Sequence, residues 1–175
     1  MMPFDKNTVK EKLPLLIDKS PHHNTIKEGI IKENLYFSRS HYNADGSASN
    51  VKALQTDKQT FSPSIKLITD LVVRNLVKFE GRGKTWFIED CWVSLYNKGD
   101  YTIRHSHNPA YWSFVYFITC PRGSSPLVFS TSGKRIKAEE GKVVLFPGWV
   151  RHHVPKNNCE GRMVCAGNVA MKINQ

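Results

Sequence analysis

Short apolar runs separated by turn residues dominate the second half of the chain. They occupy residues 86–88, 91–96, 101–107, 111–119, 127–130, 135–137, 142–146 and 162–169. The runs are rich in aromatic and β-branched side chains, and Gly, Asn, Asp and Ser lie between many of them. This pattern is typical of short antiparallel strands. It predicts a mainly β fold, built as an antiparallel sandwich or barrel.

One segment before these runs has a helical pattern instead. Ser62 and Pro63 have the residue types of an N-cap and a first helical position. Gly81 and Gly83 follow as a stop signal. The apolar residues between them fall on one face of a helix, namely Ile65, Ile68, Leu71, Val72, Leu76 and Phe79. We expect this helix to pack its apolar stripe on the outside of a sheet.

The first 60 residues have a weaker pattern. Residues 13–17 could form one short strand or a helical turn, residues 35–39 resemble a strand, and residues 43–50 form a polar loop. We expect a single domain over residues 1–175. It would have a flanking segment at 1–60, a packing helix at 61–80 and a β core at 84–170, with part of the flanking segment forming the outer wall of any pocket.

Composition narrows the class of protein. With 175 residues, 40% of them hydrophobic, the chain is long enough for one folded domain. Its net charge is +10, but no five or six basic residues run together. We therefore favour an ordinary solvated basic surface over specific nucleic-acid binding as the explanation of this charge.

The sequence also carries expectations about the compartment. Four cysteines without a Cys-x-x-Cys pair argue against a zinc ribbon and indicate reduced thiols. The N-terminal residues lack an apolar leader, and no apolar run is long enough to span a membrane. We expect a cytoplasmic protein without membrane contact.

Four of the seven histidines lie in two short segments. His105 and His107 are two residues apart, so in a strand they would point to the same face. Two such imidazoles can hold a metal ion if a neighbouring strand supplies a third ligand, for which His152 and His153 are candidates. Alternatively, one histidine of each pair only hydrogen-bonds in the core or lies on the surface. The separate pair His22–His23 has no third ligand nearby in sequence.

The histidine segments resemble a known enzyme family. The segment 101–109, followed by 113–118, is similar to the metal-binding strands of Fe(II)- and 2-oxoglutarate-dependent oxygenases. The nearest resemblance is to a group of small oxygenases common in phage and marine bacterial genomes, and prolyl hydroxylases are more distantly similar. Segment 144–154 resembles the part of these enzymes that carries the distal histidine. The likeness covers about residues 50–170 in matching order.

This resemblance implies a fold and a function. The fold is a double-stranded β-helix, a jelly-roll or cupin-like barrel with a flanking helix. The function is that of a non-haem hydroxylase that uses Fe(II), 2-oxoglutarate and O₂ on an unidentified substrate. A phage-like protein of this kind would act in the host cytoplasm.

The resemblance also assigns roles to residues. His105 is the first metal ligand and His152 the distal one, whereas His153 falls at a variable position. Arg162, ten residues after His152, would pair with the distal carboxylate of 2-oxoglutarate, because a guanidinium binds a carboxylate through two parallel hydrogen bonds. Three weaker candidates for cofactor binding are Tyr96, Asn97 and Asn168.

The chain departs from the family at several positions. His107 stands where many of these oxygenases have an acidic ligand; a site of three neutral histidines leaves Fe(II) at +2 rather than +1. Either His107 is the third ligand, or a carboxylate such as Asp100 completes the set. Phe117 replaces a tyrosine of the prolyl hydroxylases, and the adjacent Tyr116 should face away from the cosubstrate. Phe114 replaces a small glycine and would narrow the pocket.

Two other functions remain open. A cupin-type dioxygenase or isomerase would use the metal without 2-oxoglutarate. A non-catalytic module would use the histidines structurally and its basic surface to bind an acidic partner or nucleic acid. The sequence does not indicate the substrate or the oligomeric state.

Overall fold

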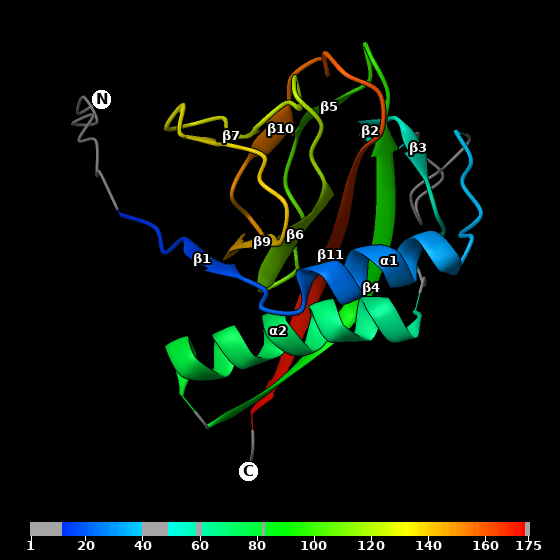
Figure 1. Cartoon of the computed structure of the whole chain (residues 1–175). Coiled ribbons are helices and arrows are strands. Elements are labelled where there is room, and N and C mark those ends of the chain that lie inside the picture. The colour runs from blue at the N-terminus through cyan, green and yellow to red at the C-terminus, as the bar shows by residue number, and fades with distance from the viewer. Residues whose placement is uncertain (1–11, 40–48, 59–60, 82, 174–175) are drawn as a thin grey trace, which may run out of the picture.

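The computed structural model describes residues 12–39, 49–58, 61–81 and 83–173 (Figure 1). Two helices lie among them, α1 (His23–Lys32) and α2 (Pro63–Glu80). The first strands are β1 (Leu16–Lys19), β2 (Val51–Lys52), β3 (Leu54–Gln55), β4 (Lys84–Tyr96), β5 (Tyr101–His105) and β6 (Trp112–Thr119). The later strands are β7 (Leu127–Phe129), β8 (Arg135–Ile136), β9 (Lys142–Pro147), β10 (His152–Val154) and β11 (Arg162–Ile173).

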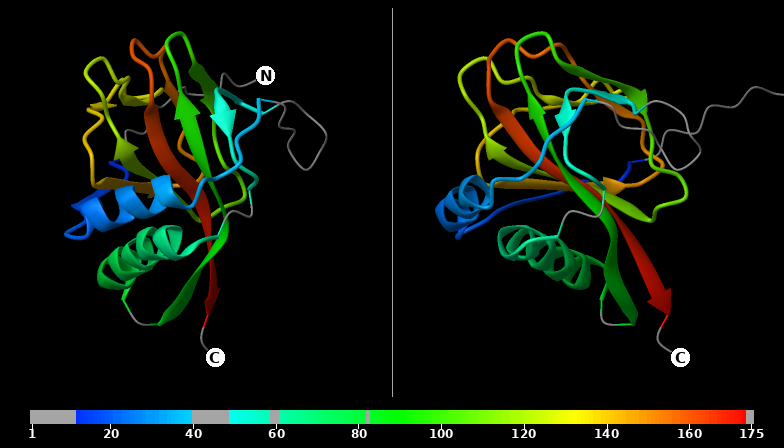
Figure 2. Two further views of the ribbon diagram at one scale, coloured as in Figure 1. Left: turned by 45° about the vertical axis from the view of Figure 1, so that its right-hand side comes forward. Right: turned by 90° about the vertical axis from the view of Figure 1, so that its right-hand side faces the viewer.

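The strands form two antiparallel sheets. A six-stranded sheet has the order β1-β9-β6-β11-β4-β3, and a five-stranded sheet has the order β2-β5-β10-β7-β8. Strands β4 and β11 are the longest and pair along almost their whole length. Both helices lie on one side of these two strands (Figure 2). The mainly β fold with a flanking helix is therefore confirmed.

Two apolar clusters hold the layers together. Strand β6 contributes to both, because its alternate side chains point to opposite faces. Tyr116 and Ile118 belong to the cluster beneath the helices, whereas Val115 and Phe117 belong to the cluster between the sheets. Alternate side chains of a strand point to opposite faces. Tyr116 therefore faces the helices, where its hydroxyl lies 2.9 Å from His23 Nδ1. This orientation agrees with the register expected from the sequence.

Helix α2 follows the sequence prediction closely. Ser62 caps it by accepting a hydrogen bond from the Ile65 backbone N–H at 3.2 Å, Pro63 opens it, and Gly81 follows its last residue. Five of the six predicted stripe residues are buried against the sheet; Phe79 is the exception, half exposed and edge-on to Trp112.

The first part of the chain differs from the predictions. The sequence predicts no helix at His22–His23, but α1 begins at His23. This helix has no side-chain cap at its start and contains Gly29, so its local signals are weak. Gly29 leaves room for the second helix, because a Cβ there would overlap Ser64 Oγ unless the serine side chain rotated. The strand expected at 35–39 is reduced to one bridge, between Ser38 and Gln55.

Other boundaries shift by a few residues. Residues 16–19 form a strand, one of the two alternatives for that region. The strand that was expected to reach residue 107 ends at His105, and the last strand continues to Ile173 instead of ending at 169. Most of the polar loop predicted at 43–50 lies outside the described residues.

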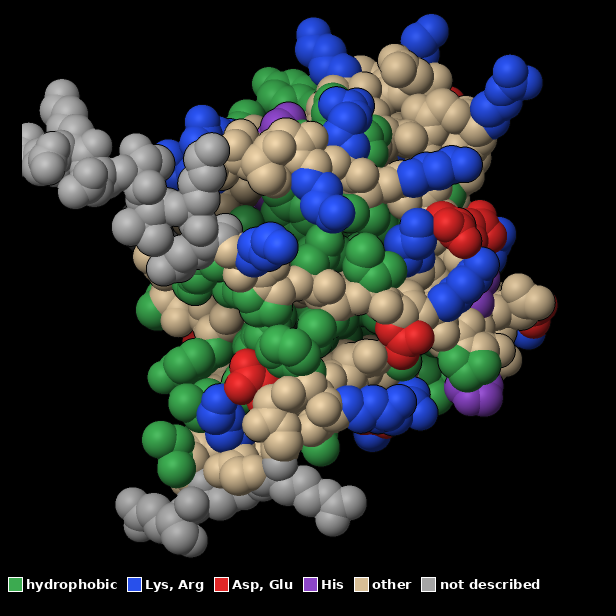
Figure 3. Space-filling model, turned by 90° about the vertical axis from the view of Figure 1, so that its left-hand side faces the viewer, with side chains coloured by type: hydrophobic (Ala, Val, Ile, Leu, Met, Phe, Trp, Pro, Cys, Tyr) green, Lys and Arg blue, Asp and Glu red, His purple; other side chains and the backbone are tan. Residues whose placement is uncertain are grey.

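The surface carries an apolar hollow at the open edge between the sheets. Figure 3 shows apolar side chains gathered there with Lys and Arg around them. The hollow measures about 680 Å³, its apolar lining includes Leu13, Phe129 and Trp149, and Lys12, Lys134 and Arg151 also line it. In the described part of the chain, neither helix is long and apolar enough to cross a membrane.

Candidate metal centre

Two paired strands bring His105 and His152 together. His105 ends β5, His152 begins β10, and the two residues are direct partners in the antiparallel pairing. His107 lies two residues beyond β5, where its backbone N–H donates to the carbonyl oxygen of Gly148 at 2.7 Å. One potential ligand atom from each of the three histidines falls in a group whose members all lie within 4.8 Å of one another.

The imidazoles are oriented as metal ligands usually are. His105 Nδ1 lies 2.8 Å from the carbonyl oxygen of Ile103, and His152 Nδ1 lies 2.9 Å from that of Val150. A carbonyl only accepts, so each Nδ1 carries the proton and each Nε2 keeps its lone pair. The Nε2 atoms of His105 and His107 are 3.2 Å apart. Two nitrogens bound at right angles to one metal, each about 2.1 Å away, would be about 3 Å apart.

Burial keeps these rings neutral. Loss of solvent lowers the pKa of His105, and it lowers that of His107 well below the ordinary value. Burial, together with the nearby His105, lowers the pKa of His152 to about 3. Neutral imidazole is the form that binds metals, so the environment favours metal binding over protonation at neutral pH.

Arg162 lines the same cavity and is fully buried, with 0% of its surface exposed. Its Nε donates to the carbonyl oxygen of Ser125 at 3.0 Å, and its guanidinium lies 4.6 Å from the Tyr96 ring centre. Both terminal nitrogens, Nη1 and Nη2, are buried without a hydrogen-bond partner among the described residues. Burial lowers the pKa of Arg162, but a guanidinium keeps its charge in proteins. An unpaired buried cation is costly, so this position is suited to an anionic ligand.

The weaker candidates from the sequence lie in different places. Tyr96 lines the cavity, and its hydroxyl is 2.7 Å from Thr102 Oγ1. Asn97 Oδ1 accepts from the Gly161 backbone N–H at 3.3 Å, and Asn168 Oδ1 accepts from Ser113 Oγ at 3.0 Å. Neither asparagine is among the residues that line the cavity.

Asp100, the alternative third ligand, has other partners. Its carboxylate accepts from Arg39 Nη1 at 3.0 Å and from the Asn97 backbone N–H at 2.8 Å. It precedes the first residue of β5, whereas His105 is the last. The group of clustered potential ligands contains His105, His107 and His152 without it. His153 is next to His152 on β10 and therefore faces the other side of the sheet, where its Nδ1 lies 3.0 Å from Ser130 Oγ.

Trp92 and Phe146 also line the cavity, although the sequence did not indicate either of them. Trp92 is 5% exposed, lines the cavity and has its ring centre 6.0 Å from that of His107. Its indole Nε1 is buried without a partner among the described residues. Phe146 presents its ring edge-on to His152, with the centres 4.7 Å apart. Alternation could have found Trp92, because it lies four residues before Tyr96 on one strand and therefore on the same face.

The cavity around these groups is narrow. About 40 Å³ of free space lies between the three histidines and Arg162, and the apolar side chains that close it include Phe114, Val115, Leu127 and Val164. Phe114, predicted to narrow the pocket, is among them. Side chains would have to move for a five-carbon dicarboxylate to enter.

Comparisons with known proteins bear on the fold. No family model and no curated protein matches the sequence. The viral collagen prolyl hydroxylase of Paramecium bursaria Chlorella virus 1, solved with 2-oxoglutarate, is 14% identical; the alignment covers 87% of this chain and 94% of that one, with a TM-score of 0.64. An oxidoreductase of the 2-oxoglutarate–Fe(II) oxygenase family from Burkholderia pseudomallei is 12% identical, over 89% of this chain and 84% of that one, with a TM-score of 0.67.

A third similar structure carries a metal. HygX from Streptomyces hygroscopicus, solved with nickel and 2-oxoglutarate, is 10% identical over 90% of this chain and 83% of its own, with a TM-score of 0.63. At these identities the likeness concerns the fold. The chain therefore has the double-stranded β-helix fold of the 2-oxoglutarate oxygenases, as the sequence led us to expect.

Proposed function

We propose that this protein is a non-haem oxygenase that uses Fe(II) and 2-oxoglutarate to hydroxylate a substrate not yet identified. One observation carries the proposal: three neutral imidazoles converge at one end of a cavity into which a buried, unpaired guanidinium also faces. The similar structures named above support it through their shared fold, two of them with 2-oxoglutarate bound.

His105, His107 and His152 would hold the metal on one side. Three protein ligands on one face leave positions open for a cosubstrate and O₂, as oxygenase sites require. The hydrogen bonds that His105 and His152 donate to the carbonyl oxygens of Ile103 and Val150 fix these two rings and increase their basicity. Bound Fe(II) would supply the oxidative chemistry together with 2-oxoglutarate and O₂.

Arg162 would bind the far carboxylate of 2-oxoglutarate. Its two partnerless nitrogens match the two oxygens of a carboxylate, and the guanidinium lies close to the rings of both Tyr96 and Phe117. The apolar side chains around the cavity would exclude water from the metal. Asn97 and Asn168 lie outside the cavity, so they would affect cosubstrate binding only indirectly, through their hydrogen bonds to Gly161 and Ser113.

Anaerobic titration tests the proposal. We expect Fe(II) and 2-oxoglutarate together to give a weak visible absorption band that neither gives alone. Arg162→Ala should raise the 2-oxoglutarate concentration needed for the band by at least tenfold, while Fe(II) binding stays near wild type. Arg151→Ala, at an exposed arginine beside His152, is the matched control. A wild-type protein that gives no band would contradict the proposal.

A second candidate is a metal-dependent dioxygenase or isomerase that does not use 2-oxoglutarate. The narrow cavity and a ligand set without a carboxylate favour it. This candidate predicts metal binding without the band, and turnover that survives Arg162→Ala. O₂ consumption measured with and without 2-oxoglutarate separates the two.

A further inference from the structure

Strand β5 contains one extra residue opposite β10. His105 pairs with His152 and Thr102 pairs with Val154, so two residues of β5, Ile103 and Arg104, lie opposite the single residue His153. This is a β-bulge, which re-aims side chains at one point of a strand. Ile103 and Arg104 are both exposed, whereas Thr102, just before them, remains buried. The bulge therefore adds a side chain to the outer face of the sheet.

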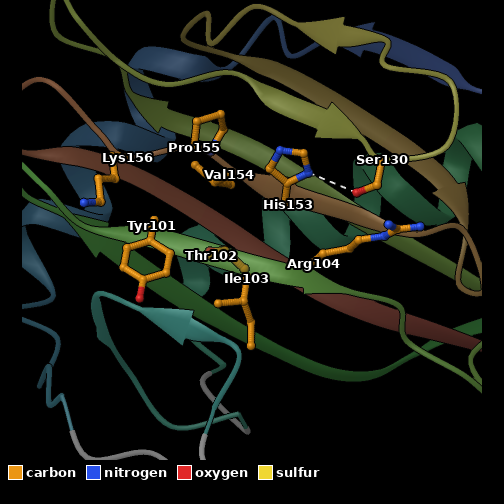
Figure 4. A pocket seen from close by; sticks show the side chains of 9 residues that line it. All are labelled: Tyr101, Thr102, Ile103, Arg104, Ser130, His153, Val154, Pro155 and Lys156. Atoms are coloured by element: carbon orange, nitrogen blue, oxygen red, sulfur yellow. Dashed lines mark hydrogen bonds between the residues drawn. The ribbon is translucent and has the colours of Figure 1, made fainter.

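A groove of about 470 Å³ lies on that outer face (Figure 4). Arg104 and Ser130 lie at one end, Lys156 at the other, and the rings of His153 and Tyr101 lie between them. We call this the outer groove. Its nine lining residues are Tyr101, Thr102, Ile103, Arg104, Ser130, His153, Val154, Pro155 and Lys156.

The outer groove has a distinct chemistry. None of its lining residues is acidic. Neither Arg104 nor Lys156 forms an ion pair within the described part of the chain. His153 Nδ1 lies 3.0 Å from Ser130 Oγ, which leaves its other ring nitrogen available to a ligand. Cations at both ends with flat rings and apolar surface between them favour a ligand that has both phosphates and planar groups.

We propose that the outer groove binds a short stretch of single-stranded nucleic acid. Arg104 contacts a phosphate at one end of the bound stretch and Lys156 contacts one at the other end, and a base between them packs against Tyr101 and the neighbouring Ile103. Proteins that bind single strands combine a basic groove with stacking side chains in this manner. An acidic peptide would use the cations but would gain little from the rings. The net charge of +10 adds a general attraction to polyanions.

Fluorescence anisotropy with a labelled twelve-nucleotide thymidine strand tests this, over salt concentrations from 50 to 200 mM. The double variant Arg104→Gln/Lys156→Gln should bind at least tenfold more weakly. Its slope of log affinity against log salt should be shallower by about 1.4, because each single-strand phosphate contact contributes about 0.7. Tyr101→Leu should weaken binding roughly fivefold or more with the slope unchanged, because it removes stacking alone.

Two control variants separate binding in the outer groove from general charge attraction and from the metal centre. Arg74→Gln/Lys78→Gln removes the same charge from the exposed side of α2 and should leave affinity and slope near wild type. His107→Ala, which alters the proposed metal centre, should also leave nucleic-acid binding intact. The nucleic-acid proposal can therefore fail without affecting the proposed oxygenase function, and the reverse. Equal losses in both double variants, equally tight binding of a twelve-residue glutamate peptide, or no binding by the wild-type protein would each overturn the proposal.

Discussion

His107 differs from the other two histidines of the cluster in how the chain holds it. The Nδ1 atoms of His105 and His152 donate to carbonyl oxygens two residues earlier in the chain. His107 lies beyond the end of β5, and its ring packs between Trp92 and the other imidazoles. Of the three proposed ligands, it is therefore the one whose replacement should leave the strand pairing intact.

We expect His107→Ala to abolish retention of Fe(II), Ni(II) or Co(II), because two imidazoles remain where three converged. His153→Ala should retain the metal, since that ring lies on the opposite face of β10. Metal analysis after purification, and calorimetric titration of the metal-free proteins, would measure the difference. Equal losses in the two variants would mean that the site is misassigned.

The buried histidines should make the metal-free protein sensitive to acid. The pKa of His152 is lowered from 6.5 to about 3 in the folded chain. Below pH 6.5 His152 binds a proton in the unfolded chain but stays neutral in the folded chain. The free energy of unfolding therefore falls as the pH is lowered from 6.5 toward 3. At pH 5 the loss from His152 alone is roughly 2 kcal/mol.

Urea unfolding in the presence of a chelator would measure this dependence. His152→Gln should show a shallower fall between pH 7 and 5, whereas His22→Gln, at an exposed histidine before α1, should follow the wild type. Parallel curves for the wild type and His152→Gln would contradict the assignment.

At the scale of elements, the two helices are joined at their ends. Glu33, directly after α1, accepts hydrogen bonds from Ser62 Oγ at 2.7 Å and from the Ser64 backbone N–H at 3.1 Å. The Ser62 hydroxyl thus caps α2 and contacts α1 at the same time. Gly29 eases the close approach of the helices, because a Cβ there would crowd the Ser64 side chain.

Removing the cap should destabilise the helical layer. Ser62→Ala should lower the free energy of unfolding by about 1 kcal/mol, a typical value for a lost N-cap. Glu33→Gln and the double variant complete a cycle in which we expect the two losses not to add, because both residues share one hydrogen bond. Denaturant unfolding measures all three, and strict additivity would show that the contact contributes little.

At the scale of the whole molecule, the proposed metal would tie distant parts of the chain together. His105 and His107 lie more than 40 positions before His152 in the sequence. A metal that binds the folded chain but not the unfolded one raises stability in proportion to the logarithm of its concentration. The histidine cluster therefore links metal binding to the stability of the five-stranded sheet, to which β5 and β10 belong.

Thermal unfolding should reveal this link. At about 100 times its dissociation constant, Ni(II) or Co(II) should stabilise the wild-type protein by about 2.7 kcal/mol and raise the melting temperature. His107→Ala should show no such rise, while His153→Ala should behave as the wild type. A similar rise in all three proteins would indicate metal binding elsewhere.

The sequence predicted some parts better than others. Helix α2 and most strands were predictable because their caps, turns and apolar spacing are local signals. Helix α1 was not, because its stability comes from packing Ile26 and Ile30 into the core cluster that it shares with α2 rather than from its own ends. At the site, alternation placed His105 and His107 on one face. The partnerless nitrogens of Arg162 and the part played by Trp92 depend on packing between distant strands, which no local pattern encodes.

The extra residue in β5 has a consequence for protein engineering. In an ordinary strand, deleting one residue reverses the facing of everything beyond it. Here, deleting either Ile103 or Arg104 would leave one residue between Thr102 and His105, opposite the one between His152 and Val154. Both flanking side chains would still point inward, so a shortened chain should keep its histidine cluster. Either deletion also changes which carbonyl oxygen lies two residues before His105, so comparing the two shortened chains would show how far the exterior of the barrel can be edited while the cluster is kept.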